Sequence, residues 1–157
     1  MKNSQNIPEE ALFLFILLVG MVGCYLGDRH SLSRTVSLNL QESQRTKGVD
    51  LSLTNAEVQE AIKVIDAVLS TNGFVREARP DMASVPGFVA GYVQYDSSGL
   101  RLATLPDVYM HSNRLDVEIV ELGNRTTHPT ALMAKICASL RTELGSRYGG
   151  ENVKIRD

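Results

Sequence analysis

The chain has few of the residues and motifs that mark a catalytic or metal centre. Its 157 residues include only two cysteines, and no Cys-x-x-Cys, His-Glu-x-x-His or Gly-x-Ser-x-Gly pattern occurs. A metal site would have to be assembled entirely from distant residues, and the local signature of a serine-hydrolase nucleophile is missing. We therefore expect no catalytic residue, no metal and no cofactor.

The chain also has no excess of charge of one sign. Sixteen lysines and arginines balance 18 acids, the formal charge is −2, and no basic run occurs. This balance gives no electrostatic reason to expect nucleic acid as a partner. The composition, 43% hydrophobic and 22% charged, is that of a globular protein and argues against wholesale disorder or a multi-span membrane protein.

What the sequence does have is one long hydrophobic run near the N-terminus. No charged residue occurs over the 17 residues from Ala11 to Gly27. That length is at the lower edge of a bilayer span, which usually takes about 20 apolar residues. The core of an export signal is shorter, about 7–15 residues, and precedes small residues. Residues 1–23 are therefore expected to form a hydrophobic signal or anchor helix.

The run ends in Met21-Val22-Gly23-Cys24, which resembles the lipobox of bacterial lipoproteins. The resemblance implies that Cys24 is lipidated, becomes the first residue of the mature chain, and holds the protein on the periplasmic side of the cell envelope. With Cys24 lipidated, Cys137 has no partner for an intramolecular disulfide.

Two alternatives to the lipoprotein reading stay open, a buried core helix and an uncleaved single-span anchor. In the anchor alternative the basic residues that follow the run, beginning with Arg29 and Arg34, outnumber the single Lys2 that precedes it. That asymmetry alone would place the domain in the cytoplasm.

Polar residues at 24–35 suggest a tether, and residues 36–157 are expected to form one domain. The capping box from Thr54 to Glu57 predicts a helix with Thr54 as its N-cap, which Gly73 ends. A second helix is predicted to begin within 127–130, with Pro129 in its first turn, and to end at Gly145 or Gly149.

Alternating or β-rich segments predict strands in the remaining sequence. They lie at 36–40, 88–95, 100–105, 115–119 and 153–155. The order is strand, helix, two or three strands, helix, strand. It looks like an α+β, ferredoxin-like βαββαβ sandwich with an extra hairpin strand, a resemblance that concerns the fold alone.

Two groups of charged residues are candidates for binding a partner. Alternation along the strand at 115–119 turns Asp116 and Glu118 away from the helices. On the last strand it turns Lys154 and Arg156 the same way. With the first strand between them, acids and bases would lie about 10 Å apart, too far for direct pairing. The second group is Arg76 and Arg79, in a charged loop after the first helix.

These observations favour a membrane-tethered binding or adaptor module that binds an envelope protein. The rivals are a small envelope enzyme or accessory subunit, and a single-span membrane protein with a soluble domain. A deep polar pocket with strongly shifted carboxylate pKa values would favour an enzyme, whereas a shallow sheet face would favour binding.

Overall fold

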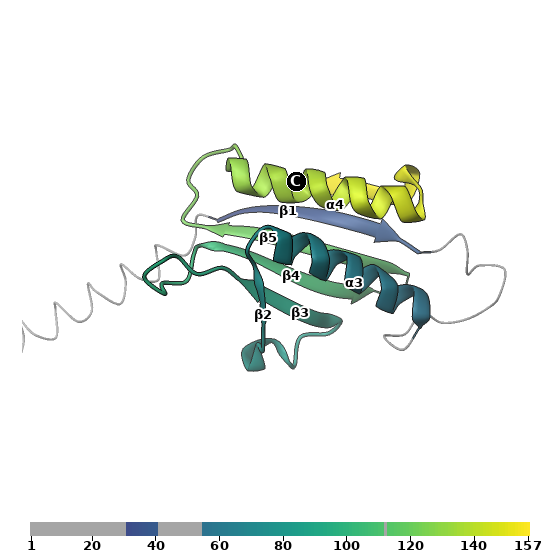
Figure 1. Cartoon of the computed structure of the whole chain (residues 1–157), viewed down its shortest axis with the longest axis horizontal. Helices are drawn as coiled ribbons and strands as arrows, with labels where there is room; N and C mark the ends of the chain where they lie inside the picture. Colours follow the sequence, from purple (N-terminus) through teal and green to yellow (C-terminus); the bar gives the residue numbers. More distant parts are fainter. Residues whose placement is uncertain (1–30, 41–54, 112) are drawn as a thin grey trace, which may run out of the picture.

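The computed structural model of the chain describes residues 31–40, 55–111 and 113–157. These residues form an α+β fold of one six-stranded antiparallel sheet and two α-helices (Figure 1). The predicted signal or anchor segment and Cys24 lie outside the described residues. No helix within the described ranges is long and apolar enough to cross a membrane.

The sheet has the strand order β2-β3-β4-β5-β1-β6, so the first strand pairs with the last two strands of the chain. Both α-helices lie on the same side of this sheet (Figure 1). The elements, in chain order, are β1 (Ser31–Asn39), α3 (Ala56–Thr71), β2 (Val75–Glu77), the 3-10 turn η1 (Pro80–Met82), β3 (Phe88–Val93), β4 (Thr104–His111), β5 (Arg114–Leu122), α4 (Ala131–Tyr148), the 3-10 turn η2 (Gly150–Asn152) and β6 (Val153–Arg156).

The two ends of α3 are set by local hydrogen bonds. Asn55, not Thr54, is the N-cap, and its side-chain oxygen accepts from the Glu57 amide at 2.9 Å. The helix therefore starts one residue later than the capping box predicts, because asparagine is at least as good an N-cap as threonine. At the other end the Phe74 amide donates to the Leu69 carbonyl at 3.0 Å in a Schellman-type ending, which confirms that the helix stops before Gly73.

Helix α4 begins and ends close to the predicted positions. Thr130 is its N-cap and accepts from the Met133 amide at 3.2 Å, so Pro129 precedes the cap instead of occupying the first turn. The helix ends at Gly149, whose φ of +88° is a conformation that glycine adopts without strain.

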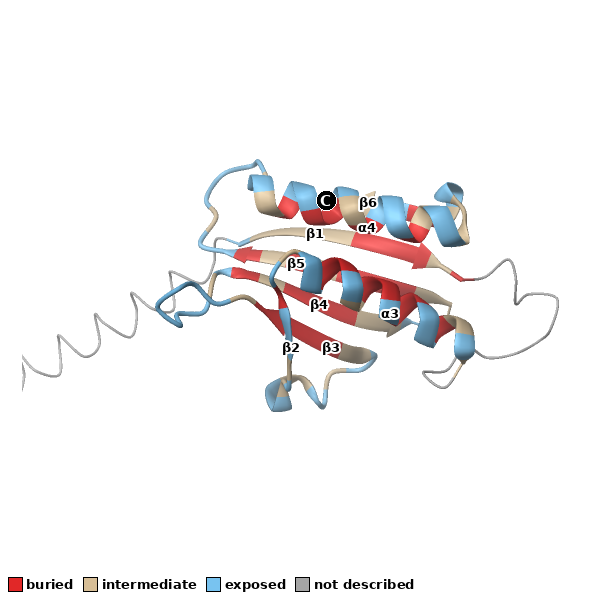
Figure 2. Ribbon diagram, in the orientation of Figure 1, coloured by how far each residue is buried: buried red, intermediate tan, exposed pale blue. Residues whose placement is uncertain are grey.

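The core lies between the two helices and the sheet face beneath them (Figure 2). Alternation along β5 turns Leu115, Val117 and Ile119 into this core, as predicted. Cys137 is buried in α4, and burial raises the pKa of its thiol, so it acts as a small hydrophobic residue. Fully buried helix residues include Val58, Ile65, Leu69, Met133, Ile136, Leu140 and Leu144.

Three strand predictions need correction. Strand β1 begins at Ser31, so residues 31–35 belong to the sheet and not to the tether. Four strands, rather than two or three, lie between the helices. The strand predicted at 100–105 is β4, which starts at Thr104 and continues past Pro106 to His111. The proline, which lacks a backbone donor, ended the predicted strand too early.

Candidate functional site

The candidate site is the face of the sheet that points away from α3 and α4, called the open face below. Among the described elements, no α-helix covers it. Asp116 and Glu118 lie on it as predicted, because their neighbours Leu115, Val117 and Ile119 fill the core. In register with them on the adjacent strands lie Ser37 and Thr35 of β1, and Tyr109 and Asp107 of β4.

Asp116 is the centre of the first charged group on this face. It is only 6% exposed, and three basic side chains from three strands converge on its carboxylate. Arg114 reaches it at 2.8 Å and the His111 ring at 3.2 Å, both on Oδ2, while Arg156 reaches Oδ1 at 3.4 Å. We call these four residues the Asp116 cluster.

The contact between Arg156 and Asp116 corrects the prediction that acids and bases are too far apart to pair. Strand β1 does separate β5 from β6, as expected. However, the estimate of about 10 Å describes backbones two strands apart, and an arginine side chain can cross most of that gap. Arg156 lies over Ser37, donates to its hydroxyl, and meets Asp116 beyond it.

Glu118 and Lys154 stay outside this cluster. Glu118 accepts a hydrogen bond from the Ser33 hydroxyl at 3.0 Å. Lys154 is exposed, sits in register with Ser37, and has no ion pair with any described residue. The predicted set of two acids and two bases is therefore split, since one acid and one base form a pair while the other two remain separate.

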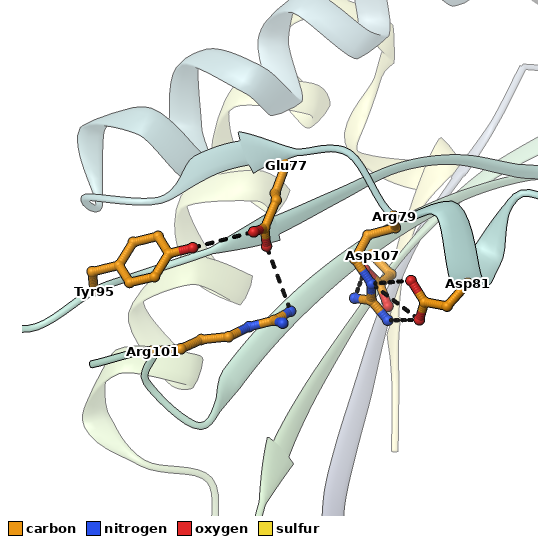
Figure 3. Close-up of polar contacts among 6 residues, drawn as sticks. All are labelled: Glu77, Arg79, Asp81, Tyr95, Arg101 and Asp107. Atoms are coloured by element: carbon orange, nitrogen blue, oxygen red, sulfur yellow. Dashed lines mark hydrogen bonds and ion pairs between the residues drawn. The ribbon is translucent and has the colours of Figure 1, made fainter. Parts of the chain in front are cut away.

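A second charged group, the Asp107 cluster, consists of Asp107, Arg79 and Asp81 (Figure 3). The Arg79 guanidinium lies 3.5 Å from Asp107 through Nη1 and 3.0 Å from Asp81 through Nη2. Arg79 is nearly enclosed, with a side chain 15% exposed, and Asp107 is buried. A Cβ atom on Gly91 would lie 2.8 Å from both the Arg79 Cγ and the Asp107 Oδ1, so only glycine leaves room for this pair.

The electrostatics of the Asp107 cluster follow from this burial. Loss of hydration raises the pKa of Asp107, the nearby Arg79 charge lowers it in part, and the Glu118 charge raises it further. On the exposed side, the hydrogen bond from Arg79 holds the pKa of Asp81 below its usual value. Asp107 is thus an acid for which ionisation is costly.

The structure does not bring Arg76 and Arg79 together as one charged group. Arg76 is in register with the core-facing Tyr92 and pairs with Asp66 of α3 at 3.7 Å, on the helix side of the sheet. The Tyr92 hydroxyl donates to the same carboxylate.

A further polar group lies on the open side of the sheet. Glu77 lies 3.9 Å from the Arg101 guanidinium and accepts from the Tyr95 hydroxyl at 3.2 Å (Figure 3).

Sequence reasoning missed His111, Arg114 and Asp107 as members of the site. The signal for Arg114 was available, since alternation puts it on the same face as Asp116 and Glu118. His111 faces Arg114 across the β4–β5 turn, which the misplaced β4 boundary concealed. The pairing of Arg79 with Asp107 spans 28 residues and has no local signal.

Two cavities lie away from the open face. One of about 280 Å³ lies between α3 and α4, with Glu60, Lys63, Glu143 and Arg147 in its wall, and one of about 450 Å³ borders the start of α4 near Glu121 and His128. Neither cavity is lined by a residue of the Asp116 or Asp107 cluster. Within the described part of the chain, no group of three or more His, Cys, Asp or Glu side chains is placed to hold a metal ion.

In comparisons with protein-family models, with curated proteins and with solved structures, nothing matches this chain.

Proposed function

We propose that the chain is a membrane-tethered binding module of the bacterial cell envelope, and that the open face is its partner-binding surface. The observation that carries the proposal is the ordered set of charged side chains on a sheet face that no described helix covers. Ordered charges at an accessible face give specificity and faster association with a complementary partner.

The membrane tether is supported by the sequence. Two features typical of membrane-targeting signals occur in it, the uncharged run from Ala11 to Gly27 and the lipobox-like Met21-Val22-Gly23-Cys24. A tether confines the domain to a surface and raises the effective concentration of partners there, so a shallow and weak binding face can still be occupied.

We propose further that the domain is ferredoxin-like. The order β6-β1-β5-β4 supports this, because it corresponds to the 4-1-3-2 order of a βαββαβ sheet, with β3 and β2 added at one edge. Both helices of such a fold lie on one side of the sheet. Among the described elements, no helix occupies the opposite side, which is where we place the partner.

The tether is tested by changing Cys24→Ser and measuring the intact mass of the membrane-bound protein. For the parent we expect a chain that has lost residues 1–23 and gained acyl groups. The variant should keep its full length, because the lipobox resemblance makes Cys24 the residue that is lipidated and becomes the first of the mature chain. An identical unmodified, full-length mass in parent and variant would instead indicate the single-span anchor.

The binding face is tested by reversing two exposed charges, Lys154→Glu with Arg156→Glu. Capture of partners from solubilised envelope should be lost, while the melting temperature changes little. Lys135→Glu with Arg141→Glu, two exposed residues of α4, is the matched control and should capture partners as the parent does. Equal capture by all three proteins would exclude this face.

An enzymatic function is the second candidate, and the Asp107 carboxyl favours it. This carboxyl is buried, has a raised pKa, and is in register with Glu118, which is the environment of a general acid. Against it, the two cavities described above do not reach Asp107. Turnover of an envelope-derived ester or amide that Asp107→Asn abolishes would replace the binding proposal.

A further inference from the structure

The number of basic side chains around Asp116 exceeds what the burial of one carboxylate requires. A buried carboxylate needs a counterion and hydrogen bonds, and Arg114 alone supplies both through Nε at 2.9 Å and Nη2 at 2.8 Å. Arg156 and His111 are additional. Among the described residues, the ion pairs of all three end on this one carboxylate.

The surplus of positive charge lies at the surface. Arg114, Arg156 and the unpaired Lys154 carry three permanent positive charges. Asp116 and Glu118, which lies across Thr35 from Arg156, carry two negative charges on the same face, so the excess is one. His111 adds a second when it is protonated. The Arg156 side chain is 48% exposed and that of Arg114 is 32% exposed, whereas Asp116 lies beneath them.

The guanidinium groups also keep donors free for a ligand. Arg156 uses only Nη2 for Asp116 and Ser37, which leaves Nε and Nη1 without a described partner. Arg114 uses Nε and Nη2, which leaves Nη1. The Asp116 carboxylate fixes both groups, so less side-chain entropy is lost when a ligand accepts from the remaining donors.

We infer that Arg114, Arg156 and Lys154, held in place by Asp116, form a binding site for a phosphate group. The exposed positive charges of Arg156 and Lys154 and the free guanidinium donors suit a phosphate monoester, whose charge is about −1.5 to −2 at neutral pH. Two arginines offer the planar donor forks that suit phosphate oxygens. The inference rests on the proposed function and deepens it by naming the chemical class that the open face binds.

The same phosphate chemistry can come from a soluble phosphate compound or from a lipid headgroup. A nucleic acid is the less favoured source, because the cluster is local and the chain as a whole carries a formal charge of −2 with no basic stripe. The lipid and soluble sources differ in whether the phosphate is fixed to the bilayer, and the experiment below separates them.

The test is calorimetric titration of inorganic phosphate into the full chain held in phosphatidylcholine nanodiscs. The parent should bind phosphate, and Lys154→Gln with Arg156→Gln should lower the affinity by at least about tenfold, the order expected when charge-assisted hydrogen bonds are lost. The control, Lys135→Gln with Arg141→Gln, removes the same charge from α4 and should bind phosphate as the parent does.

Three outcomes would overturn the inference. They are no phosphate binding by the parent, an equal affinity in both double variants, and equally tight binding of acetate, which would point to a general anion surface. If phosphate binds, the titration is repeated in discs containing phosphatidic acid. Weaker binding of added phosphate there supports a lipid headgroup as the source, and unchanged binding supports a soluble compound.

The inference and the proposed function can fail separately. Partner capture that depends on Lys154 and Arg156, without phosphate binding, would overturn the inference and keep the binding face. Phosphate binding by a chain that stays soluble and carries no lipid would keep the phosphate site and remove the membrane tether.

Discussion

Asp107 and Asp116 lie on adjacent strands of the same sheet face, and both are buried, yet their surroundings differ in charge. Asp107 has the cation Arg79 in contact and the charge of Arg101 farther away, together with two further acids nearby, Glu118 and Asp81. Asp116 is contacted by two arginines and by His111, which is a cation only when protonated, and by no other acid among the described residues. The open face therefore has an acidic half around Asp107 and a basic half around Asp116.

The difference also concerns where the cations lie. Arg79 is itself nearly enclosed, so at Asp107 both partners of the ion pair are removed from water. At Asp116 the carboxylate is enclosed while Arg156 and His111 are about half exposed. The first arrangement leaves little of the ion pair exposed to solvent, and the second presents positive charge to solvent. This is why we assign binding to the basic half.

The largest effect on stability should come from Arg79→Ala. It leaves Asp107 buried without the one cation that contacts it among the described residues, and removal of one partner of a buried pair costs about 3 kcal/mol of unfolding free energy. In the basic half, Arg156→Ala should cost less than about 1 kcal/mol, because its pair is half exposed and Asp116 keeps Arg114. Urea denaturation of both variants measures the difference. Equal losses would mean that the two halves do not differ as described.

A smaller effect is expected from Gly91→Ala. The added Cβ would approach Arg79 and Asp107 to 2.8 Å and push the pair apart, at a cost of about 1–3 kcal/mol. Gly150→Ala is the control, because its added methyl group lies in open space. Gly99→Ala is less suitable, because the positive φ of Gly99 would strain an alanine. Thermal unfolding should show a loss for Gly91→Ala and little change for Gly150→Ala. An unchanged melting temperature for Gly91→Ala would indicate that Arg79 and Asp107 do not pack against Gly91.

The smallest effect, and the one that depends on pH, concerns Asp107→Asn. The pKa of Asp107 is raised in the folded chain, so the parent loses stability as the pH rises from below the unfolded value through the folded one. The asparagine variant does not ionise and avoids this loss. Relative to the parent it should gain stability between acidic and neutral pH. Denaturation over pH 3 to 7 measures the change, and a relative loss with rising pH would contradict the raised pKa.

Much of the fold follows from local sequence patterns. The capping box that ends at Glu57 and the glycine at position 73 define α3, and alternation around Leu115 defines β5 and the face to which Asp116 belongs. The errors occur where a local rule was ambiguous. Asn55 and Thr54 are both good N-caps, and Pro106 interrupts a strand that tertiary pairing continues.

The candidate site could be predicted only in part. Alternation places Asp116, Glu118, Lys154 and Arg156 on one face, but it says nothing about how far an arginine side chain reaches across a neighbouring strand. The Arg79–Asp107 pair depends on the register of β3 against β4 and on the missing side chain of Gly91. These are tertiary properties without a local sequence pattern.

The most direct test of the difference between the two halves is an NMR titration of the isotope-labelled chain with inorganic phosphate. Backbone amides around Arg114, Ser37 and Arg156 should shift in a saturable way, while those of Gly91 and Asp107 stay in place. Shifts centred on the Asp107 half, or no saturable shift in either half, would contradict the assignment of binding to the basic half of the open face.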